Sequence, residues 1–186
     1  SRITYATLSL AMNQTDGLIE QVETIAELAP ENPKGQLLLG QTYASVDRFD
    51  EAEAALRRAI ELDPKDRSFY AVLSAVYTRT GRPVEAEVTL KEGINQSPDI
   101  LLWTLLAQLL FDEERFEEAE VALRGAIDVA AQSIEDSDDP SESDYQELSN
   151  AYKNLAAAYF QREDQAQAIA VLEQGIESLQ GNNREL

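Results

Sequence analysis

The sequence contains no cysteine and no histidine among its 186 residues. Without cysteine there are no disulfide bonds and no thiol nucleophiles, and without histidine the commonest general base is missing. Zinc sites built from thiolates and imidazoles are excluded for the same reason. We therefore expect no enzymatic activity, no cofactor and no bound metal.

Basic residues are also scarce, because 15 Lys and Arg stand against 35 Asp and Glu, for a formal net charge of −20. A surface this acidic repels nucleic acid and anionic membranes. Apolar runs stay well short of the ~20 residues that a membrane-spanning helix needs. No leader peptide is recognisable at the start of the sequence. We expect a cytoplasmic protein, or a soluble domain excised from a longer one, that binds no nucleic acid and does not insert into membranes.

The few prolines are regularly placed. Pro30, Pro64 and Pro98 lie 34 residues apart. Small and apolar residues recur at spacings of 34 or 33 residues, as the triplets Ala52, Ala86, Ala119 and Leu56, Leu90, Leu123 and Ala59, Gly93, Ala126 show. Self-similarity at such a period indicates a stack of identical supersecondary units.

Each unit has the pattern of two short amphipathic helices. In the stretch 33–66, apolar residues recur every three or four positions in both halves, which is the helical period. Asp50 is expected to cap the second helix, and Pro64 is expected to end it, because proline disfavours helix at the residue before it.

These residues make the unit similar to the tetratricopeptide repeat, through Leu39-Gly40, Tyr43, Ala52, Leu56, Ala59 and Pro64. The first unit departs from the family pattern at Gln36, where tryptophan is usual. The resemblance implies an all-α fold, a right-handed α-solenoid (superhelix) of helix–turn–helix units. The predicted organisation is a single array over 1–186: a degenerate repeat over 1–32 with a first helix over 5–12, repeats over 33–66, 67–99 and 100–131, an acidic loop insertion over 132–144, and a repeat with an extended first helix over 145–186.

The insertion is the most acidic part of the chain. Residues 99–148 contain 15 acidic and 2 basic side chains, so they carry −13 of the net charge. Like charges and Pro140 oppose helix formation, and we predict a mobile loop there. Its acids lack the spacing of an EF-hand, so no calcium site is predicted.

The resemblance also implies a function, a non-catalytic protein–protein interaction scaffold. In the family, the first helix of each pair lines a concave groove that holds a peptide or a partner helix. The matching groove positions are Gln41, Ala75, Thr78, Arg79, Leu101, Thr104, Leu105, Gln108, Phe111, Asn150, Lys153, Asn154, Ala157 and Phe160. The expected partner is therefore a protein or a peptide.

Several readings stay open at this point. Phe111 and Phe160 suit the groove and the helix-packing core equally well. Lys153, Asn154 and Arg79 are too separated by apolar positions to predict a carboxylate clamp. An alternative function is self-assembly into a homo-oligomer, with the module being part of a larger repeat protein.

Overall fold

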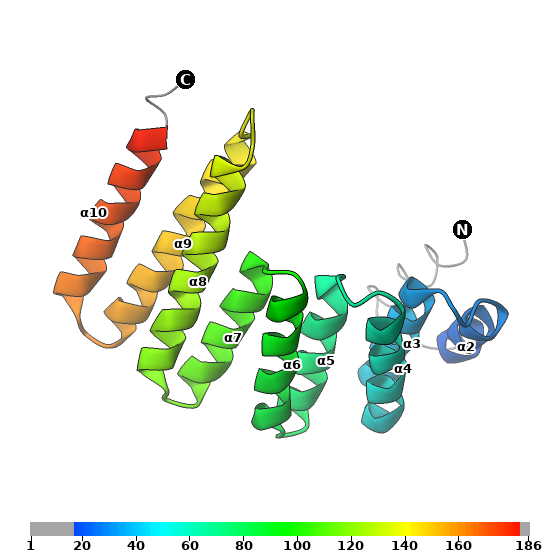
Figure 1. Cartoon of the computed structure of the whole chain (residues 1–186). Helices are drawn as coiled ribbons and strands as arrows, with labels where there is room; N and C mark the ends of the chain where they lie inside the picture. The colour runs from blue at the N-terminus through cyan, green and yellow to red at the C-terminus, as the bar shows by residue number, and fades with distance from the viewer. Residues whose placement is uncertain (1–16, 183–186) are drawn as a thin grey trace. The chain divides into compact units, whose positions relative to one another are not determined.

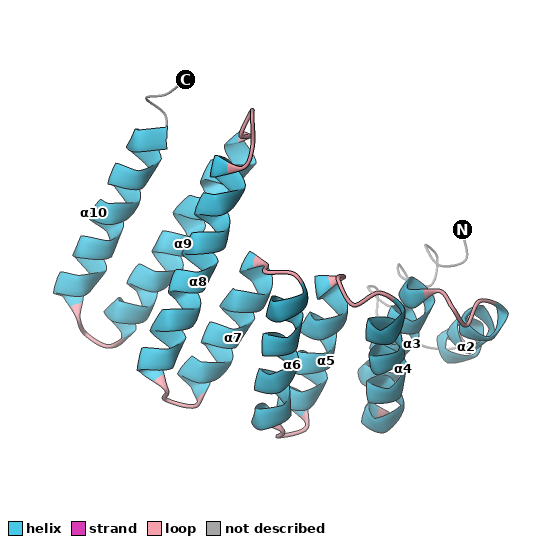
Figure 2. Ribbon diagram, viewed as in Figure 1, coloured by secondary structure: helices cyan, strands magenta, loops and turns pink. Residues whose placement is uncertain are grey.

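The computed structural model describes residues 17–182, and within that range all regular secondary structure is α-helical (Figure 2). The first unit ends at Ser97 and contains α2 (Leu18–Leu28), α3 (Pro33–Ser45), α4 (Phe49–Leu62), α5 (Arg67–Arg79) and α6 (Pro83–Gln96). The second unit begins at Pro98 and contains α7 (Ile100–Asp112), α8 (Phe116–Glu135), α9 (Glu142–Gln161) and α10 (Gln165–Asn182). Within each unit, helices that follow one another in sequence pack side by side (Figure 1).

The all-α prediction is confirmed, and the right-handed sense of the superhelix stays a prediction. Each predicted repeat from residue 33 onward contains one helix pair. The first helix predicted for the degenerate repeat, over 5–12, lies outside the described residues. None of the described helices is both long and apolar enough to cross a lipid bilayer.

The acidic insertion is the main correction. Residues 132–135 end α8 and residues 142–144 begin α9, so only residues 136–141 connect the two helices. The helix continues through this charged stretch because Ile127, Ala130 and Ile134 keep the helical spacing and are buried. On the other side of the connection, Ser141 and Asp144 form a capping box that starts α9.

The turns inside the pairs share a motif that the sequence pattern did not predict. Asp47, Gly81, Glu114 and Glu163 all have positive φ, between 59° and 70°. The residue after each of them donates its N–H to a carbonyl oxygen near the end of the first helix, as Arg48 does to Tyr43 at 2.9 Å. This left-handed residue and backward bond satisfy the last carbonyls of the helix.

The predicted cap at Asp50 is wrong for the same reason. Arg48 occupies the N-cap position of α4 and makes no side-chain cap hydrogen bond, and Asp50 lies within the first helical turn. The tight turn leads directly from one helix into the next. Asp50 still lies where the helix dipole favours negative charge.

Glycine at the packing surface brings the paired helices close together. A Cβ at Gly40 would lie 2.6 Å from Cγ of Leu56, and one at Gly175 would lie 2.9 Å from Cγ of Tyr152. Neither position has room for a larger side chain without a shift of its neighbour. Gly125, which the sequence did not single out, would place a Cβ 2.8 Å from the ring of Trp103.

A tyrosine–glutamate bridge ties the first helix of a pair to the second helix of the pair before it. The Tyr77 hydroxyl donates to Oε1 of Glu53 at 2.7 Å, and Nη1 of Arg82 donates to Oε2 of the same carboxylate at 2.7 Å. Burial and the bond to Glu53 raise the pKa of Tyr77 to about 12. Tyr43 makes the corresponding bond to Glu23 at 2.7 Å.

We predict that Glu114→Gly stabilises the chain. Glu114 has φ 59°, which is strained for a residue with a side chain. Glycine removes this strain from the folded state, but it also gives the unfolded chain more conformational entropy, which lowers stability. We expect the first effect to be the larger, with a net gain of about 0.5–1 kcal/mol in the free energy of unfolding, measured in urea. The neighbouring Glu113→Gly is the control, since Glu113 has φ −87° and the change there should destabilise. Equal effects of the two changes would contradict the assignment of strain to Glu114.

We also predict opposite effects for two Gly→Ala changes in α3. Alanine at Gly40 collides with Leu56, and this overpacking costs ~1–3 kcal/mol, more than the ~1 kcal/mol gained in helix propensity. Alanine at Gly35 meets its nearest neighbour at an ordinary 3.7 Å and should raise stability. Thermal unfolding of both variants tests this, and a stabilised Gly40→Ala variant would refute the packing argument.

Candidate functional site

The second unit contains a cavity of about 230 Å³ between its two first helices, α7 and α9. Four residues of α7, four of α9 and one of α8 line it: Thr104, Ala107, Gln108, Phe111, Leu123, Asn154, Ala157, Ala158 and Gln161. On both α7 and α9 the lining residues span positions i to i+7, which places them on one face over two turns.

The cavity exists because several of its lining side chains are short, and side-chain amides lie at its edge. Ala107 and Leu123 are buried, and Ala158 is half-buried. The inner surface of the cavity is therefore apolar and is formed mostly by short side chains. Phe111 is half-buried, and its ring packs edge-on against that of Phe116, with centroids 5.0 Å apart and planes at 70°. This contact holds the largest lining side chain in one orientation.

The polar lining groups are neutral. Thr104 donates its hydroxyl to the Ile100 carbonyl at 2.8 Å, and Gln108 donates Nε2 to Asp112 at 2.8 Å. The side-chain amides of Asn154 and Gln161 have no hydrogen-bond partner among the residues that the structure describes. A free carboxamide both donates and accepts, as a peptide group does. The lining contains no acid or base that could carry proton-transfer chemistry.

The wall formed by α9 is held against α8 by a third tyrosine–glutamate bridge. The Tyr159 hydroxyl is hydrogen-bonded to Glu120, and Nη2 of Arg124 lies 3.5 Å from the Tyr159 oxygen. The bond from Tyr159 and that from Arg124 lower the pKa of Glu120 despite its partial burial. Burial and the bond to Glu120 raise the pKa of Tyr159. The bridge helps to position α9 on α8, the helix on which α7 also packs.

The structure brings together five of the groove residues predicted from the sequence. These are Thr104, Gln108, Phe111, Asn154 and Ala157. The other predicted residues of this unit are outside the cavity: Leu101, Leu105, Asn150, Lys153 and Phe160. Of the two phenylalanines left open, Phe111 lines the cavity and Phe160 is solvent-exposed.

The sequence missed Ala107, Leu123, Ala158 and Gln161. Gln161 could have been found, because it lies seven residues, or two helical turns, after Asn154. Leu123 could not, because it comes from a second helix, which the family pattern does not assign to the groove.

The predicted groove residues of the first unit lie on α3 and α5. Gln41 is half-buried on α3, and Ala75 and Thr78 are exposed on α5. Arg79 is engaged within the unit, since it donates to the Ala44 carbonyl at 3.0 Å and to Asp47 at 2.9 Å. Its guanidinium serves the contact between neighbouring pairs.

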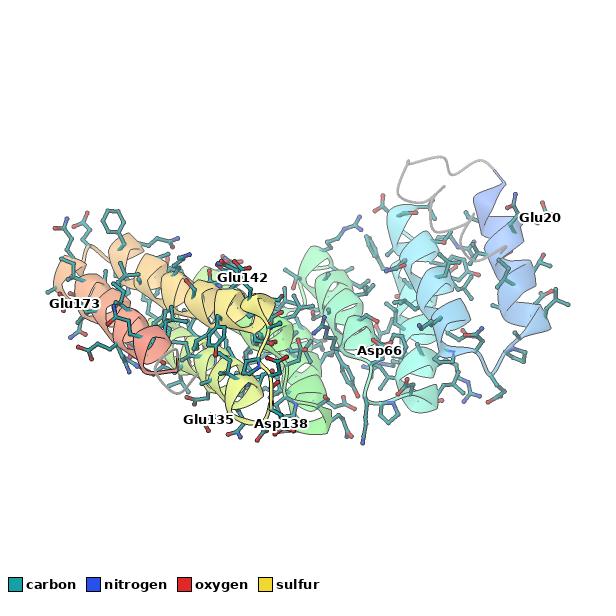
Figure 3. The ribbon with its side chains drawn as sticks, turned by 90° about the horizontal axis from the view of Figure 1, so that it is seen from above. Glu20, Asp66, Glu135, Asp138, Glu142 and Glu173 are labelled. Atoms are coloured by element: carbon teal, nitrogen blue, oxygen red, sulfur yellow. The ribbon has the colours of Figure 1, made fainter. Side chains whose placement is uncertain are left out.

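Acidic side chains gather at the end of the second unit where α8 and α9 are connected. Figure 3 shows Glu135, Asp138 and Glu142 at this end. Between residues 17 and 182, no group of three or more acidic side chains is arranged to hold a metal ion. The acidic side chains of this region lie on a solvent-exposed surface.

Three matches to models of the tetratricopeptide repeat cover much of the chain. They span residues 9–76, 45–109 and 101–133. Among solved structures, that of the protein MamA has a TM-score of 0.63 and covers 96% of each chain at 16% identity. At this identity the likeness concerns the fold alone, and it supports a helical solenoid.

Two sequence relatives are longer proteins. A pentatricopeptide repeat-containing protein of Arabidopsis thaliana is 37% identical over 90 residues, which are 44% of this chain and 15% of that protein. The type IV pilus assembly protein PilF of Pseudomonas aeruginosa is 25% identical over 139 residues, which are 74% of this chain and 50% of that protein. The chain thus spans half or less of the length of these relatives.

We predict that Tyr159→Phe removes a pH-dependent part of the stability. A carboxylate with a lowered pKa stabilises the folded state above its unfolded pKa of ~4.3, and this contribution is lost as the pH falls through the folded value. Loss of the hydroxyl should cost about 1 kcal/mol at neutral pH, and the difference from the native chain should shrink towards pH ~3.

Urea unfolding at several pH values measures this difference. Tyr145→Phe is the matched control on the same helix, because its hydroxyl has no partner within residues 17–182. A Tyr159→Phe deficit that stays constant from neutral to acidic pH would show that Glu120 is not the linked group.

Proposed function

Because this chain belongs to the tetratricopeptide repeat family, we propose that its second unit binds a short segment of a partner protein in the cavity between α7 and α9. A protein-interaction scaffold is the general role of this fold.

The free amides of Asn154 and Gln161 carry the proposal. Both lie on the cavity side of α9, seven residues apart, and neither has a partner among the described side chains and backbone groups. An extended peptide presents peptide groups at regular intervals that can pair with such amides through a donor and an acceptor each. Recognition of the main chain supplies affinity without requiring one particular sequence.

The apolar floor sets the kind of side chain that fits. A cavity of about 230 Å³ is smaller than the ~300–1,000 Å³ of sites that enclose drug-sized ligands. It has room for one or two apolar side chains of a peptide, packed against Ala107, Ala158 and Phe111. No lining side chain is charged, so a charged side chain would lose water without gaining a counter-ion.

The acidic residues around the cavity favour a partner peptide whose residues outside the cavity are neutral or basic. Residues 99–148 carry 15 acidic and 2 basic side chains. This field attracts basic segments and repels acidic ones before contact is made. We therefore propose an extended peptide with one or two apolar residues flanked by neutral or basic positions.

A test uses short random peptides displayed as a library and selected on the folded chain. We expect the double variant Asn154→Ala/Gln161→Ala to bind the selected peptides about tenfold or more weakly, because it loses two hydrogen-bonding side chains worth ~1 kcal/mol each. Fluorescence polarisation with labelled peptides measures the affinity.

Asn150→Ala is the matched control. Asn150 is an exposed amide on the same helix, one turn before Asn154, and it lies outside the cavity. It should leave the affinity unchanged. If Asn150→Ala weakens binding as much as the double variant, or if the double variant binds normally, the cavity is not the binding site.

A further inference from the structure

The α7 side of the cavity has two hydrogen-bond acceptors that the rest of the chain leaves free. The first is Oγ1 of Thr104, whose hydroxyl hydrogen is donated to the Ile100 carbonyl oxygen at 2.8 Å. A hydroxyl has one hydrogen and two lone pairs, so Oγ1 can only accept from a ligand while this bond is kept. No group within residues 17–182 donates to Oγ1. Thr104 therefore offers the cavity an acceptor.

The second acceptor is the side-chain oxygen of Gln108. Nε2 of Gln108 donates to Oδ1 of Asp112 at 2.8 Å. A carboxylate accepts hydrogen bonds and donates none, so the nitrogen end of the amide, and not its oxygen, faces Asp112. Oε1 of Gln108 has no partner in the part of the chain that the structure describes. Asp112 does not line the cavity, and it acts as a positioning residue for Gln108.

The spacing of the two acceptors matches an extended peptide. Thr104 and Gln108 are four residues apart on one face of α7, which is a rise of ~6 Å along the helix. In an extended chain the N–H groups of alternate residues point to the same edge, ~6.7 Å apart. The N–H groups of a helix are instead bonded within the helix. An extended segment can therefore pair with both acceptors, and a helical one cannot.

Resting on the proposed function of this cavity, we propose that the bound segment lies extended along α7 and donates the main-chain N–H groups of residues i and i+2, one to Thr104 and one to Gln108. A proline at either position is rejected, because proline has no N–H. The free amides of Asn154 and Gln161 remain for the opposite edge of the same segment. The site thus selects for backbone conformation as well as for apolar side chains.

Ester substitution of a bound peptide tests the proposal. The probe is a library-selected peptide whose binding requires Asn154 and Gln161, and each of its amides is replaced in turn by an ester, which removes one N–H. We expect an about fivefold loss of affinity at two positions, two residues apart, for one hydrogen bond each. Thr104→Val should abolish the loss at one position and Gln108→Ala the loss at the other, as measured by fluorescence polarisation.

Asp112→Ala tests the positioning role. It should abolish the ester loss that depends on Gln108 and keep the loss that depends on Thr104. A merely structural role of Asp112 would change the affinity for all the peptides alike. Glu113→Ala is the matched control, because it removes a neighbouring exposed acid of the same charge, and it should keep both losses. All variants should have the circular dichroism spectrum of the native chain.

The outcomes separate this inference from the proposed function. If a peptide requires Asn154 and Gln161 but fewer than two ester losses respond to Thr104→Val and Gln108→Ala, the inference is overturned and the cavity remains the binding site. Responding positions three or four residues apart would also overturn it, since the ligand would then be helical. If no selected peptide requires Asn154 and Gln161, both proposals fail.

Discussion

The contact between the second helix of one pair and the first helix of the next is the interaction on which the rest of the structure depends. A single helix pair leaves one apolar face uncovered, and only a neighbouring helix can bury it. At three such contacts a tyrosine hydroxyl is hydrogen-bonded to a glutamate of the preceding helix: Tyr43 to Glu23, Tyr77 to Glu53 and Tyr159 to Glu120. The apolar packing supplies most of the free energy, and the bridge specifies the position of one helix on the other.

The candidate cavity follows from this positioning. α7 and α9 both pack on α8, and the short side chains of Ala107 and Ala158 between them leave space that larger residues would fill. The cavity is neutral although the surrounding region is the most acidic in the chain. Neutral amides suit main-chain recognition at close range, and the acidic surface acts at longer range by selecting the charge of what approaches.

The acidic stretch also extends the helices of this unit. α8 and α9 are 20 residues long, whereas α5 and α7 are 13. The acidic residues on which the loop prediction rested lie mostly at exposed positions, where their charge costs little free energy of folding. Ile134 and Leu148 are buried in the extended part, and their burial is favourable enough to keep the helices continuous.

The sequence by itself determined the repeat and the helix pairs, because these depend on the spacing of residues along one chain. It also placed five residues of the cavity through the register. The contribution of Leu123, the exposure of Phe160 and the engagement of Arg79 with the preceding helix pair were decided by the tertiary structure alone. Each of these depends on where a side chain of one helix contacts another helix. The spacing of residues within a helix does not specify the distance between two helices.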